Sequence, residues 1–183
     1  MPIRDVELYL AGDHHVARIM SNRGANGIDG TVSTAFGIAA AGPEPVVLLI
    51  GDVALAHDIG GLITGGQLGL ALTIVLLNND GGGIFHFLPV SGEADAFEAH
   101  VATPHGLRFE HAARLYDLDY EVVSAEEELR AALRADRAPG RSRLVEVRTD
   151  RVENVALHQR VADAAVRAVS ELSRRAPAAS PGA

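Results

Sequence analysis

The chain has 183 residues, of which 16 are basic and 24 acidic, and it contains no cysteine. Hydrophobic residues make up 48% of the sequence, which predicts one folded domain with a core rather than a disordered chain. The formal net charge of −8 disfavours non-specific binding to nucleic acid or to an anionic membrane. The lack of cysteine excludes a disulfide framework and a thiolate metal site.

Two further properties narrow the class of protein. No apolar run approaches the length that spans a membrane, and the first ten residues lack the apolar stretch of a signal peptide. Aromatic residues make up 4% of the chain and tryptophan is missing, which disfavours a stacking surface for single-stranded nucleic acid. We therefore expect a soluble cytoplasmic protein with no membrane span and no nucleic-acid partner.

The first predicted elements are short. Met1–Asp13 favours a short helix or turn, and Val16–Met20 favours a short strand. Ser21–Gly30 is a glycine-rich loop, and Thr31–Gly42 is a helix of small residues that a Gly-Pro sequence ends. The small residues suit either an interface helix or a tightly packed internal helix, and the pattern leaves both readings open.

The middle of the chain alternates apolar runs with glycine-rich segments. We predict strands at Pro45–Ile50 and Leu72–Leu77, because both are rich in Val, Ile and Leu, as buried parallel strands are. A helix is expected over Leu55–Leu70. The segment Asn78–Pro104 predicts a long, mobile connection, and connections of this length are usually functional.

The last third of the chain continues the alternation of helix and strand. The predicted elements are a helix at Arg108–Asp117, a strand at Tyr120–Val123, a helix at Ala125–Ala135, a strand at Leu144–Arg148 and a helix at Val152–Arg175. This order predicts an α/β fold with a mostly parallel sheet, covered by helices on both faces. We take residues 1–175 as one domain and residues 176–183 as a disordered tail.

Two polar clusters follow the two central strands. Gly51-Asp52 comes after the first strand and Asn78–Gly83 after the second. Open α/β sheets bind ligands at the carboxyl ends of their strands. A carboxylate, an amide oxygen and a glycine-rich backbone form an oxygen ligand set for Mg²⁺, which often bridges a protein to a phosphate. Each cluster alone is ordinary turn chemistry, but together they predict a site for a diphosphate-bearing cofactor.

Longer segments then resemble a known enzyme family. Asn79 follows Asp52 by 27 positions, which resembles the thiamine-diphosphate (ThDP) signature, although Val53 stands where the generic signature has glycine. The chain is similar to 2-succinyl-5-enolpyruvyl-6-hydroxy-3-cyclohexene-1-carboxylate (SEPHCHC) synthase of menaquinone biosynthesis, which tolerates an apolar residue there. The similar segments are SNRGANGIDGTVSTAFGIAA at Ser21–Ala40, GDVALAHDIGGL at Gly51–Leu62 and LTIVLLNNDGGGIFHFLP at Leu72–Pro89.

The resemblance covers most of this chain but only the carboxy-terminal, diphosphate-binding domain of the family. It implies Mg²⁺, or Mn²⁺ in its place, bound by Asp52, Asn79 and the backbone carbonyl of Gly81. The residues implied for the cofactor are Arg23, Ile28, Gly51, Asp52, Val53, Asn79 and Gly81. Those implied for the substrates are Arg4, Arg23, Phe85 and Leu88. No catalytic residue is assigned, because the cofactor-activating glutamate of the family lies in its amino-terminal domain.

The family's reaction is that of a transferase. The resemblance implies that the enzyme decarboxylates 2-oxoglutarate and adds the succinyl-semialdehyde carbanion to isochorismate. It also implies a pyrimidine-binding domain or amino-terminal half as partner, in a homo- or hetero-oligomer. Two alternatives stay open: another ThDP-dependent decarboxylase or acetolactate-synthase-like enzyme, and a non-catalytic binding or assembly domain.

Other titratable residues carry weaker signals. His57 and Asp58 suggest acid–base chemistry, but the place of His57 on a helix favours a packing or capping role for that histidine. The histidines at positions 86, 100, 105 and 111 show no metal-binding spacing. Ile84 suits either the wall of the substrate site or a loop held by its own hydrophobic residues.

Overall fold

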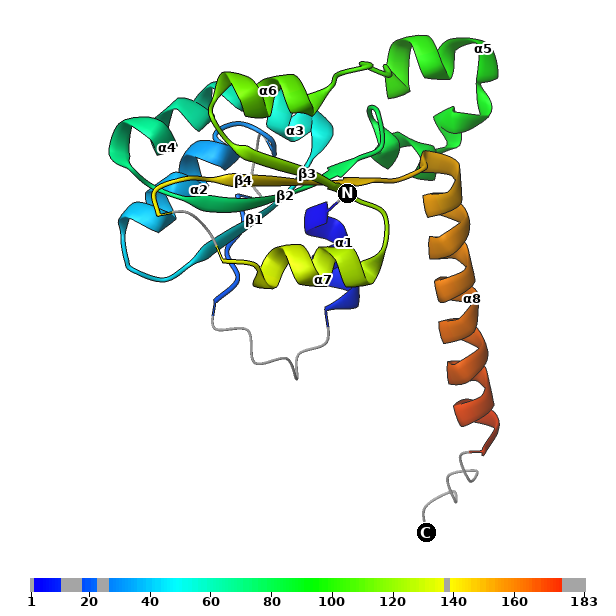
Figure 1. The fold of residues 1–183 in the computed structure, drawn as a ribbon. Helices are drawn as coiled ribbons and strands as arrows, with labels where there is room; N and C mark the ends of the chain where they lie inside the picture. Colours follow the sequence, from blue (N-terminus) through cyan, green and yellow to red (C-terminus); the bar gives the residue numbers. More distant parts are fainter. Residues whose placement is uncertain (1, 11–17, 23–26, 137–138, 176–183) are drawn as a thin grey trace. The chain divides into compact units, whose positions relative to one another are not determined.

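The structure, a computed structural model, describes residues 2–10, 18–22, 27–136 and 139–175 (Figure 1). The chain forms two compact units, residues 1–149 and 150–183, and each is described by itself. Arg23 lies outside the described residues, as does the tail from residue 176 onward. None of the helices in the described ranges combines the length and the apolar character needed to cross a membrane.

A four-stranded parallel sheet forms the centre of the first unit. Its strands are β1 (Val46–Gly51), β2 (Leu72–Asn78), β3 (Asp119–Val123) and β4 (Arg143–Arg148), in the spatial order β1-β2-β4-β3. All three neighbouring pairs are parallel. Each strand lies within one residue of its predicted position. The signal is strongest in the central strands β2 and β4, whose residues are mostly buried.

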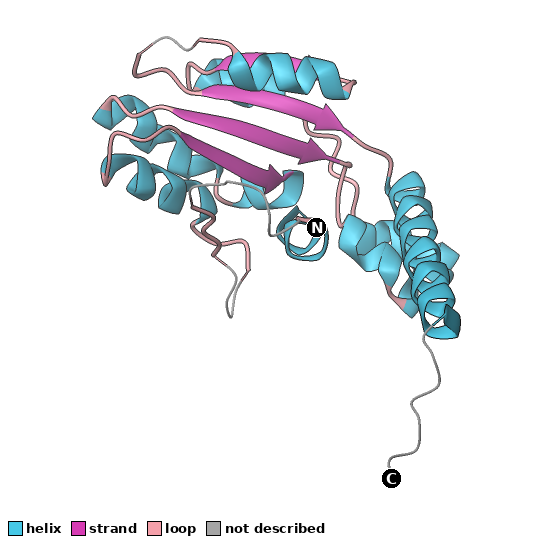
Figure 2. Cartoon of the chain, turned by 90° about the horizontal axis from the view of Figure 1, so that it is seen from below, coloured by secondary structure: helices cyan, strands magenta, loops and turns pink. Residues whose placement is uncertain are grey.

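Helices cover both faces of this sheet (Figures 1 and 2). Figure 1 shows α2, α3, α4 and α6 above the sheet, and α1 and α7 below it. Their bounds are α1 Pro2–Tyr9, α2 Thr31–Ala40, α3 Asp52–His57, α4 Ile63–Leu68, α6 Phe109–Leu115 and α7 Glu126–Arg134. The predicted α/β class with helices on both faces is therefore confirmed.

Two hydrophobic clusters hold the layers together. The larger cluster includes Phe36 from α2, Leu55 from α3 and Phe109 from α6, which pack with sheet residues such as Ile74. The smaller cluster forms around Val145, with buried side chains from β3 and α7. Burial of a large apolar side chain contributes about 1.5–3 kcal/mol to folding, so these clusters fix the sheet whose edge bears the polar segments.

The helix predicted over Leu55–Leu70 is wrong in its bounds and continuity. The observed segment begins at Asp52 and consists of α3, a 3₁₀ turn at Ile59–Leu62 and α4. The cause is Asp58, whose Oδ2 accepts hydrogen bonds from the backbone N–H groups of Val32 at 2.7 Å and Ser33 at 3.1 Å. Asp58 therefore caps the start of α2, a contact that the sequence did not predict, and the helix breaks there.

The connection after β2 also differs from the prediction of a long, mobile loop. It contains two 3₁₀ turns, the short helix α5 and a π-helical turn, at Gly83–Phe87, Pro89–Gly92, Ala94–Phe97 and Glu98–Ala102. Phe97 is 4% exposed and Ala102 is fully buried. These buried side chains hold the connection to the rest of the unit, which local glycine content does not reveal.

The predicted strand at Val16–Met20 is not found in its described part. Residues 18–20 form no strand, and all three are exposed. The start of that segment, residues 16 and 17, lies outside the described residues. A run of apolar side chains without a neighbouring strand to pair with does not form a sheet edge.

The second unit contains the helix α8 (Arg151–Arg175). Asp150 Oδ1 accepts hydrogen bonds from the backbone N–H groups of Val152 and Glu153, each at 2.8 Å. This cap explains why the helix begins within one residue of the predicted Val152.

Candidate functional site

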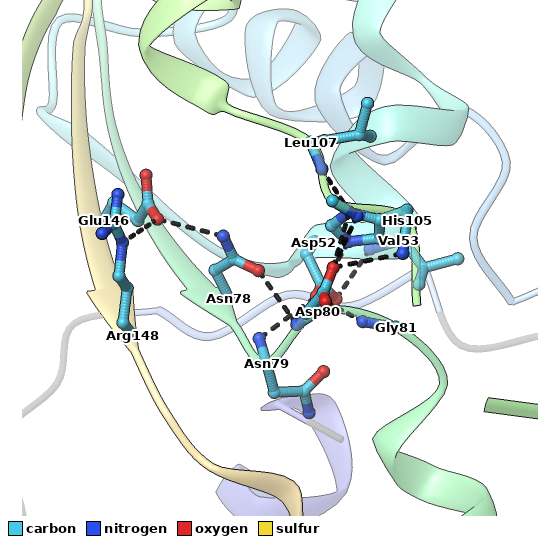
Figure 3. A network of polar contacts seen from close by, with 11 residues as sticks. Asp52, Val53, Asn78, Asn79, Asp80, Gly81, His105, Leu107, Glu146 and Arg148 are labelled. Carbon is cyan, nitrogen blue, oxygen red and sulfur yellow. Dashed lines mark hydrogen bonds and ion pairs between the residues drawn. The ribbon is translucent and has the colours of Figure 1, made fainter. Parts of the chain in front are cut away.

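Two polar segments meet at the carboxyl edge of the sheet (Figure 3). Asp52 directly follows β1, and the segment Asn79–Gly82, here called the β2 loop, follows the parallel neighbour β2. Because the register pairs Gly51 with Leu77, both strands end at nearly the same level. The structure therefore brings together the two clusters that the sequence analysis singled out.

The Asp52 carboxylate holds the β2 loop in its conformation. Asp52 is 4% exposed, and its Oδ2 accepts hydrogen bonds from the backbone N–H groups of Asn79 at 3.1 Å and Gly81 at 3.0 Å. Its Oδ1 accepts one from the Val53 N–H at 2.8 Å. A buried carboxylate therefore lies where the two strands end, enclosed by backbone donors.

Val53 departs from the ThDP signature without disturbing this arrangement. It lies in the first turn of α3, and its side chain is 39% exposed. Neither the helical backbone nor crowding at this position requires glycine. An apolar residue is therefore compatible with the role of the preceding aspartate.

The β2 loop presents an oxygen atom that lacks a partner in the described structure. Asn79 Oδ1 is buried and accepts no hydrogen bond from the described residues, an arrangement that is costly unless a donor or a cation satisfies the oxygen. Gly81 has φ +130°, and a Cβ there would lie 2.4 Å from the Ala102 carbonyl oxygen. Only glycine fits this position, so the backbone next to Asn79 is closely confined.

The oxygen atoms at this edge of the sheet match the ligands that a hard cation requires. In the described part of the chain, no three His, Cys, Asp or Glu side chains are placed to hold a metal ion. An ion at this edge would therefore combine one carboxylate with amide and carbonyl oxygens, which is a ligand set that Mg²⁺ accepts. The residues present fit the metal that the sequence analysis expects.

Asp80 and Asn78 fix the shape of the β2 loop from its two sides. Asp80 has φ 59°, a left-handed conformation that is uncommon outside glycine. Its Oδ1 accepts hydrogen bonds from the backbone N–H groups of His105 at 3.1 Å and Gly106 at 2.7 Å. The Asp80 N–H in turn donates to Asn78 Oδ1 at 3.1 Å, so local side chains stabilise the strained residue.

A buried carboxylate on β4 orients Asn78. Glu146 is 1% exposed, and its Oε1 accepts hydrogen bonds from Asn78 Nδ2 at 3.0 Å and Arg148 Nε at 2.8 Å. Tyr120 donates its hydroxyl to Glu146 Oε2 at 2.6 Å. Burial alone would raise the pKa of Glu146, but the hydrogen bonds from Tyr120, Arg148 and Asn78 lower that pKa overall.

The same network predicts how the chain behaves in alkali. Burial and the Glu146 carboxylate raise the pKa of Tyr120 from 10.0 to about 12. Because the folded state favours the neutral phenol, its stabilisation is fully present below pH 10.0 and is lost as the pH rises through about 12. Subtracting the ultraviolet titration of Tyr120→Phe from that of the wild type isolates this tyrosine. Ionisation of Tyr120 near pH 10 in the folded chain would contradict the network.

The remaining predicted site residues that the structure describes are exposed or only partly buried. Phe85 is 39% exposed, and its ring lies against the β2 loop, since a Cβ at Gly82 would meet Phe85 Cδ2 at 2.7 Å. Leu88 is 49% exposed. Arg4 lies exposed on α1, and Ile28 is partly buried in the loop before α2.

Sequence reasoning missed two residues of this site. His105 lies 53 positions after Asp52, yet its Nε2 is 3.2 Å from Asp52 Oδ2; no local pattern signals that contact. Glu146 did leave a signal, as a charged residue inside the apolar run of β4. His57, by contrast, lies on the exposed end of α3 with its Nδ1 3.4 Å from Asp29 Oδ1.

Comparison with known proteins identifies the family of the chain. Residues 11–147 match the family model "Thiamine pyrophosphate enzyme, C-terminal TPP binding domain". The SEPHCHC synthase of Bacillus pumilus (strain SAFR-032) is 45% identical over 89% of this chain and 28% of that relative. The synthase of Rubrobacter xylanophilus is 47% identical over 87% of this chain and 27% of the relative. The chain thus spans little more than a quarter of these relatives' length.

A solved structure extends the comparison to the fold. The thiamine diphosphate-dependent 4-hydroxybenzoylformate decarboxylase of Rhodococcus jostii RHA1 superposes with a TM-score of 0.51 at 28% sequence identity. The match covers 63% of this chain and 22% of the decarboxylase. Since the family model covers well over half of the sequence, from residue 11 to residue 147, the chain belongs to the family of C-terminal, thiamine pyrophosphate-binding domains of thiamine pyrophosphate enzymes.

Proposed function

We propose that this chain is the ThDP- and Mg²⁺-binding part of a SEPHCHC-synthase-like transferase of menaquinone biosynthesis. The enzyme would decarboxylate 2-oxoglutarate and join the remaining four-carbon unit to isochorismate. The observation that carries the proposal is the buried Asn79 Oδ1, which has no partner in the described structure and belongs to the loop that Asp52 holds. The relatives, at 42–47% identity, support the choice of reaction.

In this proposal three residues of the chain bind the metal. Asp52 supplies the single negative charge, while the Asn79 amide oxygen and the Gly81 carbonyl oxygen supply neutral donors. This set leaves much of the charge of Mg²⁺ for the cofactor's diphosphate, and Mg²⁺ is usually held by one or two carboxylates together with phosphate oxygens. Mn²⁺ would fit the same oxygen ligands.

Apolar and cationic residues would contact the substrates and the cofactor ring. Phe85 and Leu88 follow the β2 loop with exposed apolar side chains, which suits the wall of a site that excludes water. Ile28 would support the cofactor ring. Arg4 and Arg23 would meet carboxylates, because guanidinium groups pair well with them, and both substrates carry such groups.

When bound, ThDP supplies the electron sink that decarboxylation requires. This chain's residues would bind and orient the diphosphate end and compensate its charge. The aminopyrimidine end would lie in a pyrimidine-binding domain or amino-terminal half, within a homo- or hetero-oligomer. The share of about a quarter that the chain covers of its relatives is consistent with such a second part.

The direct test compares the purified chain with a reconstituted enzyme. The chain alone should release no CO₂ from 2-oxoglutarate above background in the presence of ThDP and Mg²⁺. Adding a pyrimidine-binding half from a SEPHCHC synthase should produce CO₂ release that depends on ThDP and consumption of isochorismate. The reason is that the resemblance places the cofactor-activating glutamate in that other half.

Two outcomes would contradict the proposal. Robust turnover by the chain alone would mean that one of its own carboxylates activates the cofactor. A reconstituted enzyme that decarboxylates other 2-oxo acids but leaves isochorismate unused would favour a different ThDP-dependent decarboxylase. The structural likeness to the Rhodococcus decarboxylase supports such a decarboxylase as the second candidate function. The synthase remains the first candidate, because the chain is more identical in sequence to the synthases.

A further inference from the structure

A turn far along the chain from Asp52 packs against the β2 loop. This turn, Thr103–Leu107, links the π-helical turn to α6. Just before it, the Ala102 carbonyl accepts a hydrogen bond from the Gly82 N–H at 2.7 Å. Within it, His105 has a largely buried side chain, 17% exposed. Its ring contacts the buried Phe109 ring edge to face, with 5.9 Å between the ring centroids. The contact with Phe109 therefore packs the His105 ring against α6, and Figure 3 shows the ring next to Asp52 and Asp80.

The hydrogen bonds of His105 determine which ring nitrogen faces Asp52 as a donor. The backbone N–H of Leu107 donates to His105 Nδ1 at 3.0 Å, so Nδ1 is an acceptor and the neutral ring carries its proton on Nε2. Nε2 lies 3.2 Å from Asp52 Oδ2. Asp80 Oδ1, 3.3 Å from Nδ1, already accepts two backbone N–H groups of the turn. The ring thus presents an N–H to Asp52.

This N–H makes the two oxygens of Asp52 unequal. Oδ2 receives three donors: the backbone N–H groups of Asn79 and Gly81 and the ring N–H of His105. Oδ1 receives only the Val53 N–H. Since a carboxylate oxygen has about two lone-pair sites, Oδ2 is saturated and Oδ1 keeps capacity for another partner.

We propose that His105 is a positioning residue for the metal site: its Nε2–H fixes the Asp52 carboxylate so that Oδ1 is the oxygen that binds the cation. The inference rests on the proposed function, because Asp52 must be the metal ligand. Partners that orient a metal ligand in this way typically change metal affinity by about 10–100-fold when they are removed.

Two near-isosteric variants separate this role from a structural one. In His105→Gln, the side-chain amide nitrogen can take the place of Nε2 and donate to Asp52. In His105→Asn, the shorter carboxamide can only take the place of Nδ1, where its oxygen accepts the Leu107 N–H. The first variant keeps the contact with Asp52 and the second keeps the contact within the turn.

The experiment measures binding of Mn²⁺ to the full 183-residue chain in saturating ThDP, with free Mn²⁺ counted by electron paramagnetic resonance. The wild type and His105→Gln should bind with similar affinity, and His105→Asn and His105→Ala should bind about 10–100-fold more weakly. His111→Asn, an exposed position on α6, is the matched control and should bind like the wild type. Urea unfolding of each metal-free variant is recorded in parallel.

The outcomes separate the inference from the proposed function. If His105→Asn binds Mn²⁺ as tightly as the wild type, or if affinity follows urea stability across the variants, His105 has only a structural role. If the wild type shows no Mn²⁺ binding that depends on ThDP, the proposed function itself fails. Should His105→Ala not fold, the comparison between the Gln and Asn variants still decides.

Discussion

Asp52→Ala is expected to abolish Mg²⁺-dependent binding of ThDP. Asp52 supplies the only charged ligand in the proposed set, and Mg²⁺ held by an amide and a carbonyl oxygen alone binds weakly. The change also removes the acceptor for the backbone N–H groups of Asn79 and Gly81. Leaving buried donors unpaired costs about 1–3 kcal/mol each, so the β2 loop should lose its shape together with its charge.

Asp52→Asn separates these two effects. The amide keeps one oxygen that can accept from the β2 loop, but it lacks the charge that attracts the cation. Calorimetric titration of ThDP with and without Mg²⁺ should therefore show lost metal dependence in both variants, while urea unfolding should show a smaller loss of stability for Asp52→Asn. Undiminished Mg²⁺ dependence in Asp52→Asn would contradict the assignment of this residue as the charged ligand.

Asp58→Ala is the matched control for these variants. Asp58 lies on the same segment, six residues later, but caps α2 through Val32 and Ser33. Loss of a helix cap costs about 0.5–2 kcal/mol of stability. The control should therefore unfold more easily and still bind ThDP in a Mg²⁺-dependent way, which separates stability from ligand affinity.

Gly81→Ala is expected to disrupt the β2 loop and with it the metal site. A Cβ at Gly81 would lie 2.4 Å from the Ala102 carbonyl oxygen, a backbone atom that cannot turn away, and the φ of +130° is unfavourable for alanine. The backbone conformation alone should cost about 1–3 kcal/mol, and the overlap adds to that cost. The Gly81 carbonyl, a proposed ligand, should move as the loop relaxes.

The measurement is urea unfolding together with the ThDP titration in Mg²⁺. Gly81→Ala should lower both the free energy of unfolding and the ThDP affinity. Gly92→Ala is the matched control, because a Cβ there meets no atom within 4 Å and its φ is not positive. If Gly81→Ala unfolded and bound ThDP like Gly92→Ala, the close confinement of the β2 loop would be wrong.

The sequence predicted the strands well because their signal is local. Leu72–Leu77 is an apolar run with Thr73 as its one polar residue, and the burial of Leu72–Leu76 on both faces leaves little ambiguity. The break near Asp58 could not be read in the same way. It depends on a capping contact with Val32 and Ser33, which lie about 26 positions earlier and come close only in the folded chain.

The residues of the site likewise differ in whether local sequence could predict them. Asp52 and Asn79 stand at the ends of strands in a recognisable spacing, so their meeting at one edge followed from parallel topology alone. His105 reaches Asp52 only because the connection after β2 folds into short helices around Phe97 and Ala102. Local composition suggested an open loop there, and the contact could not be predicted without the tertiary packing.

The most direct test of the central claim is to locate the metal. Crystals of the chain grown with ThDP and Mn²⁺ would show the ion by its anomalous scattering. The account predicts one ion bound by Asp52 Oδ1, Asn79 Oδ1 and the Gly81 carbonyl oxygen. An ion bound elsewhere on the chain, or ThDP bound with no metal at these three oxygens, would contradict it.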